Sequence, residues 1–139
     1  MSTKIRPELS EKNKYHIEKH RYYELKHFCL QYNIWKKIYC SLLPSHAASN
    51  ISIGTGSKNH FSDPTCDSGV IRAYYKTKMQ IVEDAAKETD IFLCEYILKA
   101  VTEELSYNYL RTRLDMPCSR DLYYDKYRKF FWILNIKRD

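Results

Sequence analysis

Glycine is scarce in this chain, and its scarcity limits what the chain can fold into. Of 139 residues only three are glycine and four are proline, so there is little material for the tight turns that connect strands. Apolar side chains instead recur every three or four positions, the spacing of one helical face. We therefore expect an all-α fold: a small bundle of about five or six helices, whose core draws on 44% hydrophobic residues.

Changes in composition divide the chain into three parts. Residues 1–43 begin with a polar, basic arm up to about residue 15, which we expect to be mobile, and continue as a helical hairpin. Residues 44–62 hold two of the three glycines, five serines and a single charge, which is typical of a flexible linker. Residues 63–139 should form a longer helical unit, with Asp63 as the N-cap of its first helix and Pro64 in the first turn.

Apolar spacing predicts which side chains these helices bury. In the N-terminal hairpin a break near Asn33 gives either two short helices or one kinked helix. Its stripe is Tyr22, Leu25, Phe28, Cys29, Tyr32, Ile34, Trp35, Ile38, Tyr39 and Leu42. The helix after Asp63 should run to about Lys87 and offer for packing Val70, Ile71, Tyr74, Met79, Ile81 and Val82. A helix over 90–104 is apolar around much of its circumference, which is typical of the central helix of a bundle.

Positive charge collects at the two ends of the chain. The net charge is +6; residues 1–43 hold 9 Lys/Arg against 4 Asp/Glu, residues 44–105 hold 6 against 9, and residues 106–139 hold 8 against 4. Basic segments suit a polyanion such as nucleic acid, because neutralising phosphates releases condensed counterions. A basic but merely solvated surface is the simpler alternative.

The most informative pattern lies in residues 106–135. Ser106 suits the N-cap of a helix of about eight residues, and Asp115-Met116-Pro117 cannot continue that helix, because proline lacks an amide hydrogen. Cys118 or Ser119 would then start a longer helix. Its buried stripe would be Tyr123, Tyr127, Phe130, Phe131 and Leu134, with Trp132 pointing away toward another helix, a second protomer or a partner protein.

A short helix, a turn of three or four residues and a longer basic helix are typical of a helix-turn-helix. Spacing alone does not separate this reading from an ordinary amphipathic hairpin, and the turn lacks the glycine common in the motif. In a helix-turn-helix the start of the second helix reads base edges while flanking cations hold phosphates. We expect Ser119 and Arg120 to read bases. The candidate DNA-binding residues are Arg111, Arg113, Ser119, Arg120, Tyr124, Lys126, Arg128 and Lys129.

Three segments resemble a known family. MPCSRDLYYDKYRKFFWIL, the upstream YILKAVTEELSYNYL and the Asp-Pro-Thr helix start are similar to small phage and prophage proteins of the RinA/ArpU type. The resemblance covers roughly residues 63–135; HRYYELKHFCLQY is similar more loosely. It implies a transcription regulator with a C-terminal helix-turn-helix similar to region 4 of sigma factors. It also implies binding to late phage promoters in the cytoplasm of a bacterial host and contact with host RNA polymerase.

Two other functions stay open. The chain would instead be a phage protein that binds a host protein or ribonucleoprotein as an inhibitor or adaptor, since a fold does not fix a function. A DNA-recognition subunit of a packaging terminase fits less well, because its DNA-binding module is usually N-terminal. Retention of duplex DNA without a partner separates these functions from the first. A homodimer would suit a two-fold DNA site, but no residue pattern requires one.

Catalytic, metal and membrane signals are weak. The five cysteines are odd in number and form no CxxC pair, so we expect reduced thiols in the cytosol. His16, His20 and His27 would share one face of a continuous helix, but no acidic or thiolate partner has a convincing spacing. There is no Gly-x-Ser-x-Gly, HExxH or phosphate loop, no ~20-residue apolar span and no targeting sequence. We expect no enzyme activity, no cofactor, no metal and no membrane contact.

Overall fold

The computed structural model describes residues 13–42 and 64–139, with side chains from Ser68 onward in the second range. This part is all-helical, which confirms the predicted fold class of a small helical bundle. The elements are α1 (Lys19–Leu30), α2 (Tyr32–Ser41), α4 (Pro64–Thr89), α5 (Cys94–Glu103), α6 (Tyr107–Arg113) and α7 (Arg120–Arg138). Most of the predicted N-terminal arm, the linker over 44–62 and the Asp63 cap lie outside the described residues.

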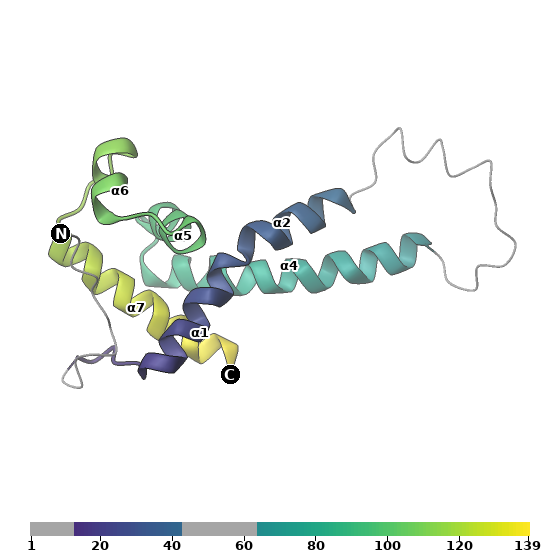
Figure 1. Ribbon diagram of the computed structural model, residues 1–139, viewed down its shortest axis with the longest axis horizontal. Helices are drawn as coiled ribbons and strands as arrows, with labels where there is room; N and C mark the ends of the chain where they lie inside the picture. The colour runs from purple at the N-terminus through teal and green to yellow at the C-terminus, as the bar shows by residue number, and fades with distance from the viewer. Residues whose placement is uncertain (1–12, 43–63) are drawn as a thin grey trace, which may run out of the picture.

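The long helix α4 is the axis of the molecule. α2 packs alongside it, and α5 and α7 also pack against it (Figure 1). Its second half is buried through Met79, Val82, Ala85 and Ala86, and the two alanines allow neighbouring helices to approach closely. The prediction that a helix over 90–104 lies at the centre is therefore wrong. α5 begins only at Cys94 and buries one face.

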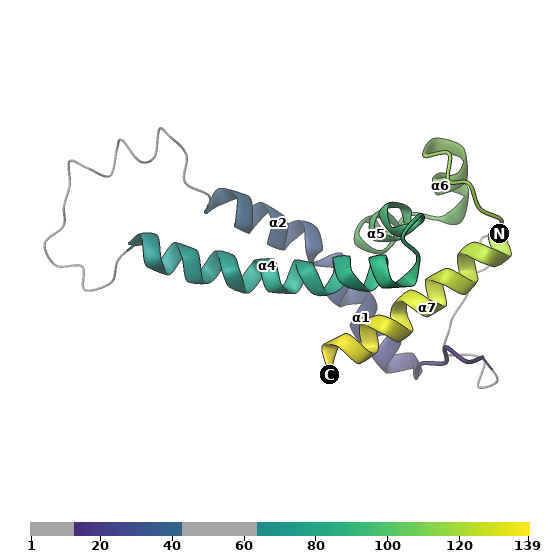
Figure 2. The same cartoon turned by 180° about the vertical axis from the view of Figure 1, so that it is seen from behind.

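The helices α1 and α2 do not form the predicted hairpin. They follow one another with a bend at Gln31, and in both views α2 runs along α4 while α1 lies near α7 (Figures 1 and 2). The apolar stripe of this segment has two partners: the Tyr32 hydroxyl donates to Glu83 on α4 at 2.6 Å, while Tyr22 packs on Phe131 of α7. Because the two halves of the stripe face different helices, α2 packs against α4 and not against α1.

One buried cluster connects the N-terminal helices to the rest. Leu25, Cys29, Phe130, Phe131 and Leu134 are fully buried in it, which confirms the predicted stripes of α1 and α7. Polar contacts close the same interface: the Tyr22 and Tyr127 hydroxyls lie 2.7 Å apart, and Arg21 donates to Asn135 Oδ1 at 2.6 Å. Residues 19–41 and 64–138 therefore share a core.

The first half of α4 is much more exposed than predicted. The side chains of Val70 and Tyr74 are 67% and 57% exposed, and Ile71 is exposed as well. Figure 1 shows this half of α4 and α2 projecting together from the rest of the fold. We call residues 31–42 and 68–82 the arm; from here on this name does not refer to the basic N-terminal segment. Among the described helices only α2 lies beside this half of α4, so one side of it has no neighbour to pack on.

The remaining sequence expectations concern ligands and the N-terminal segment. His16 precedes α1, so the three histidines do not share a helical face, and the described residues contain no group of three metal-ligand side chains. Tyr15 packs on Trp132 with ring centroids 5.7 Å apart, so the contact expected for Trp132 is made within the chain. No described helix has the length and apolarity to cross a membrane. Cys29, Cys40, Cys94 and Cys118 are free thiols.

Candidate nucleic-acid interface

The segment between α6 and α7 is fixed to the core by its own side chains. Leu110 and Met116 are fully buried, and the Met116 amide donates to the Leu110 carbonyl at 3.1 Å. Burying a side chain as large as methionine contributes about 1.5–3 kcal/mol. The turn is therefore a packed element that sets the direction of both helices.

Serine caps define the beginning of each helix. Ser106 Oγ accepts a hydrogen bond from the Tyr109 amide at 3.1 Å, and Ser119 Oγ accepts one from the Leu122 amide at 3.3 Å. The Ser106 cap is confirmed, and of the two predicted starts of the second helix Ser119 is the cap, so that α7 begins at Arg120. Each cap satisfies an amide that the helix itself leaves unpaired.

The connection is longer than predicted and contains a left-handed residue. It runs over residues 114–119 instead of three or four positions, because α6 ends at Arg113. Asp115 has φ 54°, a region that favours glycine but that aspartate tolerates better than most residues. Asp115 thus takes the conformation for which the sequence offers no glycine.

Two side chains of α6 brace the turn from outside. Arg111 Nη1 donates to the Met116 carbonyl at 2.8 Å, and the Tyr107 hydroxyl donates to the Cys118 carbonyl at 2.8 Å. Buried backbone carbonyls need such partners. Part of the donor capacity of Arg111, which we predicted to hold phosphate, is therefore used within the protein.

Arg120 stands at the first position of α7 and leans on α6. Its Nη2 donates to Asn108 Oδ1 at 3.2 Å, and its guanidinium carbon lies 5.4 Å from the centroid of the Tyr107 ring. The residue is exposed. One hydrogen bond and one cation–π contact orient the guanidinium and leave most of its donors open.

Lys126 is held by an acidic residue outside the motif. Its Nζ lies 3.5 Å from Asp90 Oδ2, and both side chains are mostly buried. Asp90 also accepts hydrogen bonds from the Phe92 and Leu93 amides, at 2.8 and 3.1 Å, in the turn between α4 and α5. Lys126 therefore connects α7 to that turn.

Burial, two amides and a cation act on the Asp90 carboxyl. Burial raises its pKa, but the Phe92 and Leu93 amides and the Lys126 ammonium together outweigh burial and hold the pKa below its ordinary value. Because the folded-state pKa is below the unfolded one, the stabilisation is complete above the unfolded pKa, about 3.9. It is lost as the pH falls through the folded-state pKa.

The variant Asp90→Asn tests this directly. We expect it to lower the free energy of unfolding by about 1 kcal/mol at neutral pH, because the charge-assisted bonds weaken. The difference from the wild type should shrink as the pH falls below about 4, where the wild-type carboxyl protonates too. Urea unfolding at several pH values measures both effects, with Asp125→Asn as the control at a carboxylate that makes no ion pair among the described residues. A difference that is the same at every pH would contradict the assignment.

The remaining candidates are exposed or half-buried. Arg113, Arg128 and Lys129 make no ion pair or hydrogen bond with the described residues, and Arg113 is exposed while the other two are half-buried. Tyr124 is half-buried against the Tyr107 ring at 6.2 Å. Of the eight predicted residues, Arg111, Ser119 and Lys126 thus have defined roles inside the protein, whereas Arg113, Arg128 and Lys129 have no ion-pair partner among the described residues.

Neither cysteine chemistry nor the carboxylates of α7 suggest a reaction centre. Burial raises the pKa of the Cys118 thiol, the opposite of what a reactive thiolate needs. Asp121 and Asp125 make no ion pair with Arg128 or Lys129, although helical spacing made such pairs an option.

Known proteins do not identify the chain. No protein-family model, curated protein or solved structure matches it.

Three residues of this region were missed by the sequence analysis. Tyr107 and Asn108 position Arg120, and Asp90 pairs with Lys126. Each partner is distant in sequence, by 12 residues in the case of Asn108. No local pattern marks such a pair.

Proposed function

We propose that this chain is a sequence-specific duplex-DNA-binding protein of the RinA/ArpU type, with α6, the turn and α7 acting as its helix-turn-helix. The observation that carries the proposal is the exposed first turn of α7. Ser119, Arg120, Asp121 and Leu122 are all exposed, while the turn before them is fixed in the core. A rigid turn that presents the start of a helix is what base recognition in the major groove requires.

The charges on α7 favour one approach of the DNA. Arg120, Tyr124 and Arg128 follow one another at four-residue spacing and form a line on the helix, beside α6. Asp121 and Asp125 form the adjacent line, which would repel phosphates. The DNA should therefore lie against the Arg120 line and Arg113 of α6, and Lys129, which follows the two carboxylates one turn further along their own line, should contribute less.

The resemblance to RinA/ArpU proteins extends the proposal to biology. A protein bound at a late phage promoter in the bacterial cytoplasm would activate transcription by contacting host RNA polymerase. A homodimer would suit a two-fold operator. Fluorescence anisotropy with duplex DNA from phage promoter regions and with random duplex, at two salt concentrations, tests the first step. Tight, sequence-dependent binding supports the proposal, and weak binding that is equal for every sequence contradicts it.

Arg120→Ala separates base reading from phosphate binding. We expect it to weaken binding to the preferred duplex by about 1–3 kcal/mol, the contribution of a bidentate base contact, and binding to random duplex far less. Asn108→Ala is the matched variant, because it removes the hydrogen bond that orients the guanidinium but keeps the charge. It should cost less than Arg120→Ala. Equal losses on both duplexes would reassign Arg120 to the phosphates.

A further inference from the structure

The arm carries a charge pattern that differs from the rest of the molecule. Residues 31–42 and 68–82 contain no aspartate or glutamate. Their cations are Lys36, Lys37, Arg72, Lys76 and Lys78. None of these makes an ion pair with a described residue, and Arg72 Nε is buried without a hydrogen-bond partner there. Among the described residues, the cations of the arm therefore have no acidic ion-pair partner.

Aliphatic side chains lie among these cations. On α2, Ile34 is 57% exposed, and Ile38, one turn further on, is half-buried. On α4, Val70 and Tyr74 are likewise one turn apart and exposed. Gln31, Ile34 and Ile38 share a face of α2 at spacings of three and four. Exposed isoleucine and valine therefore lie on the same stretches of α2 and α4 as the lysines.

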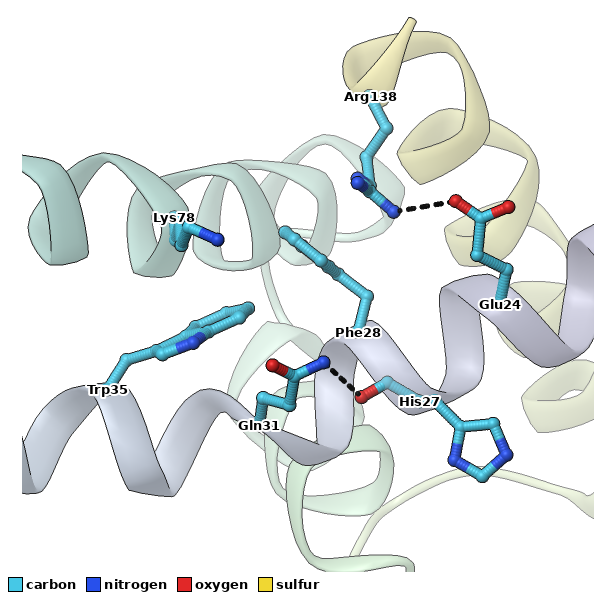
Figure 3. Close-up of a pocket in the computed structure, with 7 residues that line it drawn as sticks. All are labelled: Glu24, His27, Phe28, Gln31, Trp35, Lys78 and Arg138. Carbon is cyan, nitrogen blue, oxygen red and sulfur yellow. Dashed lines mark hydrogen bonds and ion pairs between the residues drawn. The ribbon is translucent and has the colours of Figure 1, made fainter.

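A cavity of about 320 Å³ lies at the base of the arm, with Gln31, Trp35, Lys78, Arg138 and the carboxylate Glu24 in its wall. Figure 3 shows Lys78 and Arg138 extending from α4 and α7 toward the space beside the Phe28 ring. Arg138 lies 4.1 Å above that ring and pairs with Glu24 at 3.2 Å. Lys78 contacts only aromatic rings among the described residues: its Nζ lies 5.5 Å from the Trp35 centroid and 4.8 Å from the Tyr74 centroid.

Lys78 connects the cavity to the apolar side of the arm. The same ammonium lies over Trp35, in the cavity wall, and over Tyr74, beside Val70. Gln31, which also lines the cavity, shares one face of α2 with Ile34 and Ile38. Through Gln31 and Lys78 the cavity therefore adjoins the aliphatic side chains of both helices, and Lys78 itself faces aromatic rings.

We propose that this surface binds an acidic amphipathic helix of a partner protein. The aliphatic side of that helix would pack on Ile34, Val70 and Tyr74, and one of its carboxylates would enter the cavity beside Lys78. A second copy of the arm is a poor occupant, because it would bring like charges together. Nucleic acid would pair with the lysines but would leave Ile34, Ile38 and Val70 exposed to water. The proposal does not depend on DNA binding by α7.

Synthetic peptides test the chemistry without knowledge of the natural partner. The first is an amphipathic peptide of about 18 residues with leucines at helical spacing and glutamate elsewhere, and the second carries lysine in place of each glutamate. We expect the full chain to bind the acidic peptide at least about tenfold more tightly than the basic one, measured by fluorescence anisotropy. In a ¹⁵N correlation spectrum, the Gln31 side-chain amide and the Trp35 indole should shift on binding.

Variants assign the binding to the two parts of the surface. Lys78→Ala should lower the affinity for the acidic peptide about fivefold, which is the effect of losing one partly shielded ion pair. Ile34→Ser and Val70→Ser should weaken it up to about tenfold through lost apolar contact. All three positions lie outside the fully buried core, and Lys99→Ala on the exposed side of α5 is the charge-matched control that should change nothing.

Two results would overturn the proposal. One is equal binding, or no binding, of the acidic and basic peptides. The other is that the arm binds nucleic acid. In that case Lys36→Ala and Lys76→Ala would weaken binding to random duplex DNA, whereas Ile34→Ser would change neither DNA binding nor peptide binding. Loss of DNA binding through Arg120→Ala alone would leave the arm proposal untouched.

Discussion

Replacing Phe131 with alanine should lower the free energy of unfolding by about 3–5 kcal/mol, the range for a large aromatic side chain removed from a packed core. Phe131 is fully buried. Its ring centroid lies 5.0 Å from Tyr22, 4.9 Å from Tyr127 and 5.0 Å from Phe130. The substitution therefore opens a cavity where α1 meets α7, and it also removes three edge-to-face ring contacts.

The neighbouring residue provides the control for this prediction. Trp132→Ala removes a larger ring, but this side chain is 38% exposed, and its described ring contact is with Tyr15. We expect a loss of about 1 kcal/mol or less. Urea unfolding followed by far-ultraviolet circular dichroism measures both variants. Comparable losses for the two would mean that α1 and α7 do not pack through Phe131.

Removing Arg113 and Arg128, two arginines of the proposed interface, should strongly weaken binding to duplex DNA. Arg113 and Arg128 make no ion pair with the described residues, so the double variant Arg113→Ala, Arg128→Ala disturbs little inside the protein. Two lost phosphate contacts should reduce the slope of log K against log salt by about 2 and the affinity near 0.1 M salt by roughly 50-fold.

The salt slope makes this prediction specific. A general loss of folding would lower the affinity without changing the slope in that proportion, and circular dichroism excludes it independently. Lys137→Ala is the charge control, because Lys137 pairs with Glu88 at 2.8 Å in the last turn of α7, far along the helix from its exposed first turn. An unchanged slope in the double variant would move the DNA contact to another surface.

Local chemistry explains which parts of the fold were predictable. The caps at Ser106 and Ser119 each depend on an amide three residues away, and the stripe of Tyr123, Phe130 and Leu134 depends on helical period alone. Such features depend only on residues close together in the chain, and for this reason the sequence predicts them. The end of α6 before Pro117 follows from the missing amide hydrogen of proline.

Features that depend on distant partners were not predictable. Ile34, Val70 and Tyr74 have the apolar character of core residues, but whether they are covered depends on where other helices lie. The same holds for Lys126, whose role changes from phosphate ligand to structural cation because Asp90 lies beside it. The predicted hairpin of α1 and α2 was wrong because a stripe shows that a face is buried and not which helix buries it.

The contact between α1 and α7 has a consequence for biosynthesis. Arg21 and Asn135 are 114 positions apart, and α7 is translated last of the described helices. Until it leaves the ribosome, the apolar face of α1, with Tyr22 and Leu25, has no α7 to cover it. Closure of a core through contacts so distant in sequence is slow compared with helix formation. The nascent chain should therefore carry an exposed hydrophobic segment for most of its synthesis, at the stage when chains are most prone to aggregate.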